Sequence, residues 1–185
     1  MTVATQIKRG NVIVLNNDLY RIIRLEHITP GKGNAIVHAD LRSIRTGVKT
    51  NRRYRSSEDI ETVEVYNRRM QYLYSDGDIF HFMDQENFEQ YEIAKDMLDE
   101  TIYYILPDHT YDVMVYENNP IGIELPPTVT MKITETSPAE KGTQGKTKDA
   151  ILETGLKVRI PLFFEEGEEI VINTETNGYL ERAKK

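Results

Sequence analysis

The stretch Thr29-Pro30-Gly31-Lys32-Gly33-Asn34 lies between two alternating apolar runs, Tyr20–Ile28 and Ala35–Ile44. Alternation with a period of two predicts β-strands, and Gly with Pro between such runs predicts a turn, so the whole segment is predicted to be a β-hairpin. The proline cannot donate a hydrogen bond, so strand pairing should end there, and the two glycines permit positive φ on either side of Lys32. Lys32 is therefore expected at an unobstructed tip, either as an ordinary solvated side chain or as a lysine presented for a function.

Short strand signals, separated by turn residues, recur along the rest of the chain. Further strands are predicted at Val12–Leu15, Leu19–Ile23, Val48–Arg55, Met70–Tyr74, Ile79–Met83, Asp112–Glu117, Ile121–Leu125, Val129–Glu135, Val158–Phe164, Glu169–Thr174 and Tyr179–Ala183. Phe88–Leu98 has apolar residues at roughly helical spacing, and at most a short helix is predicted there. The Gly-, Lys- and Thr-rich segment Ser137–Asp149 is predicted to be a mobile loop.

Two candidate joints, Asp59–Val65 and Pro126-Pro127, divide these strands into three groups. Five or six short strands in the first group are enough for a small β-barrel. We therefore expect three all-β modules near residues 1–64, 65–127 and 128–185, with few contacts between them. No convincing internal repeat is visible at the level of residue identities.

The composition excludes several classes of protein. The 185-residue chain contains no cysteine, which excludes disulfides, Cys-based zinc sites and thiol catalysis. Met1–Gly10 lacks the apolar core of a signal peptide, and no run approaches the ~18 apolar residues of a membrane span. We expect a cytoplasmic protein that does not contact a membrane.

The net charge of −7 is unevenly distributed along the chain. Residues 1–65 carry 11 basic and 7 acidic side chains, residues 66–127 carry 3 and 13, and residues 128–185 carry 9 and 10. A basic N-terminal part on an acidic chain indicates that this part faces a polyanion, the alternative being random scatter of charge. Small β-barrels that bind phosphates usually do so through Lys and Arg, and six such residues lie close in sequence to the Lys32 loop: Arg42, Arg45, Lys49, Arg52, Arg53 and Arg55. Tyr54, among them, either stacks on a base or fills the barrel rim.

Motifs of enzymes and metal sites are missing from the sequence. The four histidines show neither HExxH nor His-x-His spacing, so no metal ligand is predicted. Gly145-Lys146-Thr147 resembles the end of a phosphate-binding P-loop, but that motif needs glycine at position 140, which is glutamate. There is no Gly-x-Ser-x-Gly and no kinase signature. We predict that the protein has no catalytic residues and no cofactor.

Four groups of residues resemble bacterial elongation factor P. Pro30-Gly31-Lys32-Gly33 with Ala35 and Leu41–Gly47 is similar to its first domain, and Asp76-Gly77-Asp78 with Phe82-Met83 to its middle domain. The longest and most specific match is C-terminal: Lys148-Asp149-Ala150, Glu153-Thr154-Gly155, Val158, Ile160-Pro161-Leu162-Phe163 and Gly167, followed by the Tyr-x-x-Arg ending at Tyr179 and Arg182. Together these groups cover essentially the whole chain.

The resemblance implies an SH3/KOW-like barrel followed by two OB-fold barrels in an L shape. It implies a monomeric translation factor, not an enzyme, that binds the ribosome and ribosomal RNA next to the P-site peptidyl-tRNA and promotes peptide-bond formation at proline runs. Lys32, in the loop formed with Pro30, Gly31, Gly33 and Asn34, would point at the acceptor end of the tRNA. In the family this residue usually carries a post-translational extension, and a lysine here leaves three alternatives: a lysyl-type extension or an aminopentanol-type extension, either added by a lysine-modifying enzyme, or no modification. The RNA-binding residues would be Arg42, Arg45, Lys49, Arg52, Arg53, Tyr179 and Arg182.

One departure from the family concerns the segment Lys141-Gly142-Thr143-Gln144-Gly145, where family members often have Gly-Asp-Thr in a longer loop. In the family this longer loop is expected to face the exit-site codon. Because the aspartate is missing here, the resemblance does not extend to contact between this loop and the codon. The alternative to the family function is a general OB-type RNA-binding protein or RNA chaperone, which would need no special lysine.

Overall fold

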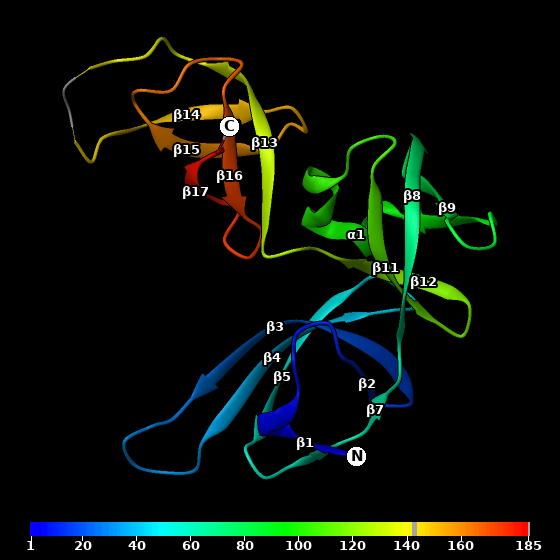
Figure 1. Cartoon of the computed structure of the whole chain (residues 1–185). Helices are drawn as coiled ribbons and strands as arrows, with labels where there is room; N and C mark the ends of the chain where they lie inside the picture. Colours follow the sequence, from blue (N-terminus) through cyan, green and yellow to red (C-terminus); the bar gives the residue numbers. More distant parts are fainter. Residues whose placement is uncertain (142–143, 185) are drawn as a thin grey trace.

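A computed structural model describes residues 1–141 and 144–184 of the chain. Strands dominate, and in those residues the helical elements are short: η1 (Ala4–Gln6), α1 (Lys95–Leu98) and η2 (Asp99–Tyr104). The chain forms three small β modules, whose strands span residues 2–63 in module I, 66–124 in module II and 128–182 in module III. Module II lies at the bend between modules I and III (Figure 1). The predicted all-β class of three small barrels is confirmed.

Module I contains the predicted hairpin. Its antiparallel five-stranded sheet has the order β5-β4-β3-β2-β7, and a short β1–β6 pair lies beside it. The strands are β1 (Thr2–Val3), β2 (Val12–Leu15), β3 (Asp18–Ile28), β4 (Ile36–Ser43), β5 (Lys49–Arg55), β6 (Asp59–Ile60) and β7 (Thr62–Val63). Alternate residues of these strands fill the core, including Ile13, Ile22 and Leu41, which are fully buried.

Modules II and III have the same strand topology. The sheet orders are β10-β9-β8-β11-β12 and β15-β14-β13-β16-β17, and in each module the two outer strands approach each other and close the barrel. The bounds in module II are β8 (Tyr66–Asp76), β9 (Ile79–Asp84), β10 (Gln90–Ala94), β11 (Thr110–Tyr116) and β12 (Asn119–Glu124). Those in module III are β13 (Thr128–Thr136), β14 (Thr147–Leu152), β15 (Lys157–Pro161), β16 (Glu169–Asn173) and β17 (Gly178–Arg182). A five-stranded barrel of this kind is an OB fold, so the chain contains a structural repeat that its residue identities do not reveal.

At most a short helix was predicted at Phe88–Leu98, and the structure has one there, α1, but the strand in the same segment was not predicted. Gln90–Ala94 forms strand β10, which pairs with β9, and only the four residues of α1 are α-helical. Ile93 is buried against Phe82 and Met70 in the core of module II, so pairing and burial overrode the weak helical spacing.

Modules I and II are joined by a small buried apolar cluster. This cluster joins Val12 of β2 to Met114 and Ile121 of β11 and β12, and all three side chains are at least 95% buried. Burial of such side chains stabilises a contact by about 1.5–3 kcal/mol each. The junction between modules I and II is therefore small but includes a buried apolar cluster, which the sequence did not reveal.

Module II also reaches into the core of module III. Tyr104, the last residue of η2, is only 2% exposed and belongs to the module III core together with Met131 and Phe164. Its hydroxyl donates to Oδ1 of Asn177, and the Thr154 hydroxyl donates to the Tyr103 carbonyl at 2.6 Å. Tyr104 is thus part of η2 in the chain, but its side chain packs in the core of module III.

The loop predicted at Ser137–Asp149 is shorter than expected, because β14 begins at Thr147. Gly142 and Thr143, which belong to the segment that departs from the family, lie outside the described residues. The boundaries 1–64, 65–127 and 128–185 remain a prediction about folding units. Within the described residues, no helix has the length and apolar character needed to cross a membrane.

Candidate functional site

Lys32 lies at the tip of a long hairpin arm. Strands β3 and β4 pair from Tyr20↔Ser43 out to Ile28↔Ile36, and the connecting loop projects away from the rest of module I (Figure 1). Lys32 is exposed, and no hydrogen bond or ion pair engages its ammonium group within the described part of the chain. The base of the loop is fixed where the Ser56 amide donates to the Ala35 carbonyl at 3.0 Å. The arm therefore carries the Lys32 ammonium group, unpaired within the described residues, on a loop whose base is held in place by a hydrogen bond.

The two glycines that flank Lys32 differ in conformation. Gly33 has a φ of +117°, which side-chain-bearing residues rarely adopt. Gly31 does not have a positive φ, and open space surrounds the position a Cβ would take. The sequence suggested positive φ on both sides, but only the residue after Lys32 requires glycine for its backbone.

One face of the module I sheet is lined with charged residues between the hairpin and module II. We call this the polar sheet face: its cross-strand rows are Arg53–His38–Glu26, Asn51–Asp40–Arg24 and Lys49–Arg42–Arg21. Because side chains alternate across a strand, the opposite face carries Val37, Ala39 and Leu41, which are in the core. The hairpin arm and this face thus form one continuous polar surface.

The predicted basic residues do not all share that surface. Arg52 and Arg53 are neighbours on β5 and point to opposite faces. Arg52 lies over the Tyr54 ring at 5.3 Å, and Tyr54 is 4% exposed, so it fills the barrel and is not placed to stack on a base. Arg45 is exposed and pairs with Asp18 at 3.1 Å; this hydrogen bond is the main reason that the pKa of Asp18 is lowered.

Arg42 requires a correction, because it is 5% exposed and its guanidinium is engaged between modules I and II. It donates to the carbonyls of Gly47 and Asp96 and pairs with Asp99 at 2.8 Å. Lys49 reaches the same carboxylate at 2.7 Å. Burial tends to raise the pKa of Asp99, but hydrogen bonds and charge from Lys49 and Arg42 outweigh it, so the pKa is lowered. Arg42 therefore joins the modules, and we remove it from the set of proposed phosphate contacts.

Tyr179 and Arg182 lie together at the other end of the molecule. Tyr179 packs edge-on against Phe164, with ring centroids 5.5 Å apart. Arg182 lies over the rings of Phe163 and Phe164 and pairs with Glu168 at 3.2 Å. Its side chain is 56% exposed, so part of the guanidinium remains accessible to a partner.

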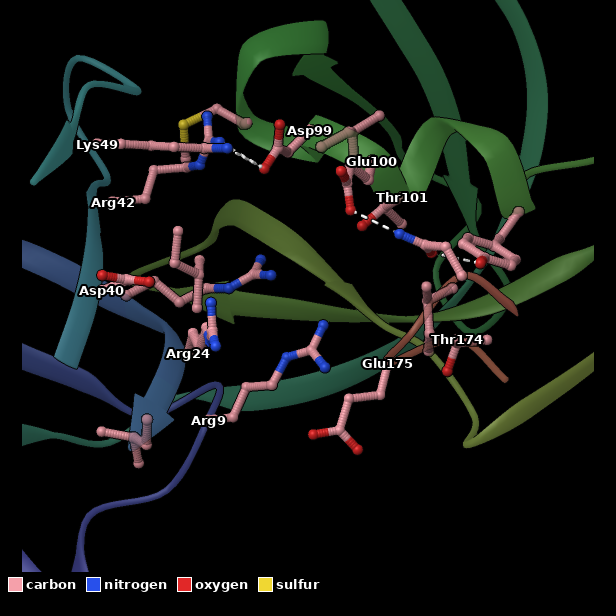
Figure 2. Close-up of a pocket in the computed structure, with 18 of the residues that line it drawn as sticks. Arg9, Arg24, Asp40, Arg42, Lys49, Asp99, Glu100, Thr101, Thr174 and Glu175 are labelled. Carbon is pink, nitrogen blue, oxygen red and sulfur yellow. Dashed lines mark hydrogen bonds and ion pairs between the residues drawn. The ribbon is translucent and has the colours of Figure 1, made fainter. Parts of the chain in front are cut away.

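A cavity of about 700 Å³ occupies the inner corner where all three modules meet. Figure 2 shows Arg42 and Lys49 directed at Asp99 along one side, while Arg9 projects into the open space. Arg21 also lines the cavity, and burial, with the charges of Arg9 and Arg42, lowers its pKa to about 10. Sequence reasoning missed Arg9 and Arg21, because their cavity exists only once the modules are docked.

Comparison with protein families accounts for nearly the whole chain. Residues 3–60 match the elongation factor P KOW-like domain, residues 65–123 the elongation factor P OB domain, and residues 129–182 the elongation factor P C-terminal domain. The chain belongs to the elongation factor P family. This is a family of translation factors rather than enzymes, and membership implies an interaction with the ribosome. Lys32 and β5 lie within the KOW-like match, and Tyr179 and Arg182 within the C-terminal match.

Solved structures of two translation factors are also similar. One is eukaryotic translation initiation factor 5A from Methanococcus jannaschii, 21% identical, covering 66% of this chain and 90% of that chain with a TM-score of 0.44. The other is a translation initiation factor eIF-5A family protein from Naegleria fowleri, 18% identical, covering 67% of this chain and 94% of that chain with a TM-score of 0.38.

Proposed function

We propose that this elongation factor P family protein binds the ribosome in the cytoplasm, beside the P-site peptidyl-tRNA and ribosomal RNA, and promotes peptide-bond formation at proline runs. The observation that supports this most directly is the exposed Lys32 on its hairpin arm, whose ammonium group has no protein partner among the described residues. Because the lysine contributes little to packing, its placement fits contact with another molecule better than stabilisation of the fold.

Positioning is the chemistry that such an arm can supply. Proline has a fixed φ, which limits how the reacting amine and ester can align. Holding reactants in near-attack geometry can lower a barrier by up to about 7–11 kcal/mol. A lysine that contacts the acceptor end of the tRNA can restrict its motion through hydrogen bonds to phosphate or ribose oxygens, without transferring a proton. The ribosome remains the catalyst, and the arm stabilises the productive geometry.

The function is tested with purified protein from its native host in a translation system that lacks this factor. We expect the protein to restore synthesis through a Pro-Pro-Pro reporter and to leave a matched reporter without consecutive prolines unchanged. Equal stimulation of both reporters would instead favour the general RNA-binding alternative. Intact-mass spectrometry of the same sample tests whether a lysine-modifying enzyme has extended Lys32.

The basic residues around β5 are proposed to supply phosphate contacts, together with Arg45, Lys49, Tyr179 and Arg182. Replacing Arg52 and Arg53 with glutamine should weaken tRNA binding. It should also make the negative slope of log affinity against log salt shallower by about 1 to 2, since each phosphate contact contributes about 0.7–0.9. Fluorescence titrations at several salt concentrations measure both quantities. A matched pair of changes at the exposed Lys132 and Lys157 of module III is the control, and an unchanged slope in the arginine variant would contradict the proposal.

A further inference from the structure

The corner cavity contains two cations without counterions. Arg9, from the segment before β2, and Arg21, from β3, both line it. Within residues 1–141 and 144–184 neither side chain forms an ion pair. The only hydrogen bond of the Arg21 guanidinium in that part of the chain is a long one, from Nη1 to the Ile121 carbonyl at 3.4 Å, and its Nε is buried without a partner. Burying a guanidinium in this way costs free energy unless an anion accompanies it.

Most other charges in the cavity wall are already engaged. Arg24 pairs with Glu26, Asp99 holds both Arg42 and Lys49, and Glu100 accepts a hydrogen bond from Asn177 at 2.8 Å. The remaining carboxylates of the wall are Asp40, on the polar sheet face, and Glu175, on module III (Figure 2). Neither forms an ion pair with Arg9 or Arg21 in the described part of the chain.

The immediate surroundings of Arg21 are dominated by positive charge. After burial, the charges of Arg9 and Arg42 are the largest causes of its lowered pKa, ahead of the opposing effects of Asp99 and Glu124. The guanidinium also cannot be displaced towards module II, because it packs on the backbone of Gly122, where an added Cβ would lie 1.5 Å from Nη1. The fold therefore keeps the Arg21 guanidinium close to the positive charges of Arg9 and Arg42, at a fixed position that faces the cavity.

We propose that this cavity is a phosphate-binding site, in which Arg9 and Arg21 bind the phosphate oxygens. Guanidinium groups suit this role because their planar donors match phosphate oxygens bidentately. The 700 Å³ cavity is large enough for a phosphate group and is lined by all three modules, so a bound phosphate also stabilises their relative arrangement. The phosphate belongs either to a free anion or to an RNA backbone, and only the second source rests on the proposed function.

The site is tested by titrating the full-length protein with inorganic phosphate at constant ionic strength, with chloride as the reference, using NMR shifts or calorimetry. We expect saturable binding that Arg9→Gln weakens about tenfold or more, since it removes charge-assisted hydrogen bonds. Arg9 is exposed and makes no ion pair in the described part of the chain, so the variant should fold normally. The neighbouring Lys8→Gln, exposed and outside the cavity lining, carries the same charge change and should leave phosphate binding unchanged.

Phosphate effects equal to those of chloride, or equal weakening by Lys8→Gln and Arg9→Gln, would overturn the site. A tRNA titration separates the two sources. Loss of tRNA affinity in Arg9→Gln, beyond that in Lys8→Gln, assigns the site to an RNA phosphate, whereas unchanged affinity assigns it to a free anion. Lys32→Ala protein should keep full phosphate binding, so a failure of the proposed ribosomal function would not be mistaken for a failure of this site.

Discussion

Replacing Lys32 with alanine is expected to abolish the stimulation of polyproline synthesis while leaving the melting temperature almost unchanged. The reason is geometric: the side chain is exposed at the end of the β3–β4 arm and makes no hydrogen bond or ion pair in the described residues. Surface substitutions away from special contacts usually change stability by less than about 0.5 kcal/mol. The measurement is the Pro-Pro-Pro reporter assay, combined with a thermal melt of each protein.

Lys32→Arg separates charge from lysine chemistry. Arginine keeps the positive charge and approximate reach, but a lysine-modifying enzyme cannot act on a guanidinium. If function requires an extended lysine, we expect this variant to be inactive as well, because arginine cannot receive the extension. Full activity of Lys32→Arg would show that charge alone suffices, and full activity of Lys32→Ala would exclude the proposed mechanism.

Tyr104→Ala is expected to lower the free energy of unfolding by about 3–5 kcal/mol, the range for removing a large buried aromatic side chain. The ring is 2% exposed and packs in the core of module III, although the residue belongs to η2 beside module II. Burial and the nearby Glu100 raise the pKa of Tyr104 to about 12, so the hydroxyl stays protonated and donates to Asn177 at neutral pH. The loss should therefore destabilise module III and its attachment to module II together.

Two variants test whether packing is the cause. Tyr104→Phe keeps the ring and removes one hydrogen bond, so it should cost only about 0.5–1.5 kcal/mol. Tyr74→Ala removes a tyrosine that is 53% exposed and stacks on His81, and should cost no more than about 1 kcal/mol. Urea unfolding curves give all three values, and a Tyr104→Ala loss no larger than that of Tyr104→Phe would show that the ring does not contribute to the core.

The hairpin was predictable because its signals are local. Alternating residues, a proline and two glycines fix the strands and loop within Tyr20–Ile44. The strand at Gln90–Ala94 was not, since its few residues had ambiguous spacing and only pairing with β9 decided between helix and strand. Arg52 and Arg53 illustrate a second limit: adjacency in sequence suggested one basic surface, whereas strand geometry places them on opposite faces.

Local sequence patterns were enough to predict the all-β class, the position of Lys32 at a hairpin tip and the family to which the chain belongs. Three other features are visible only in the folded and docked modules: Arg42 joins modules I and II, Tyr104 fills the core of module III, and Arg21 faces a cavity. These contacts link residues far apart in the chain: Arg42 to Asp96 across 54 positions, Tyr104 to Asn177 across 73, and Arg21 to Ile121 across 100. Strand periodicity and turn chemistry act over a few residues, whereas the docking of one module on another depends on the complementary shape and charge of surfaces that exist only after each module has folded.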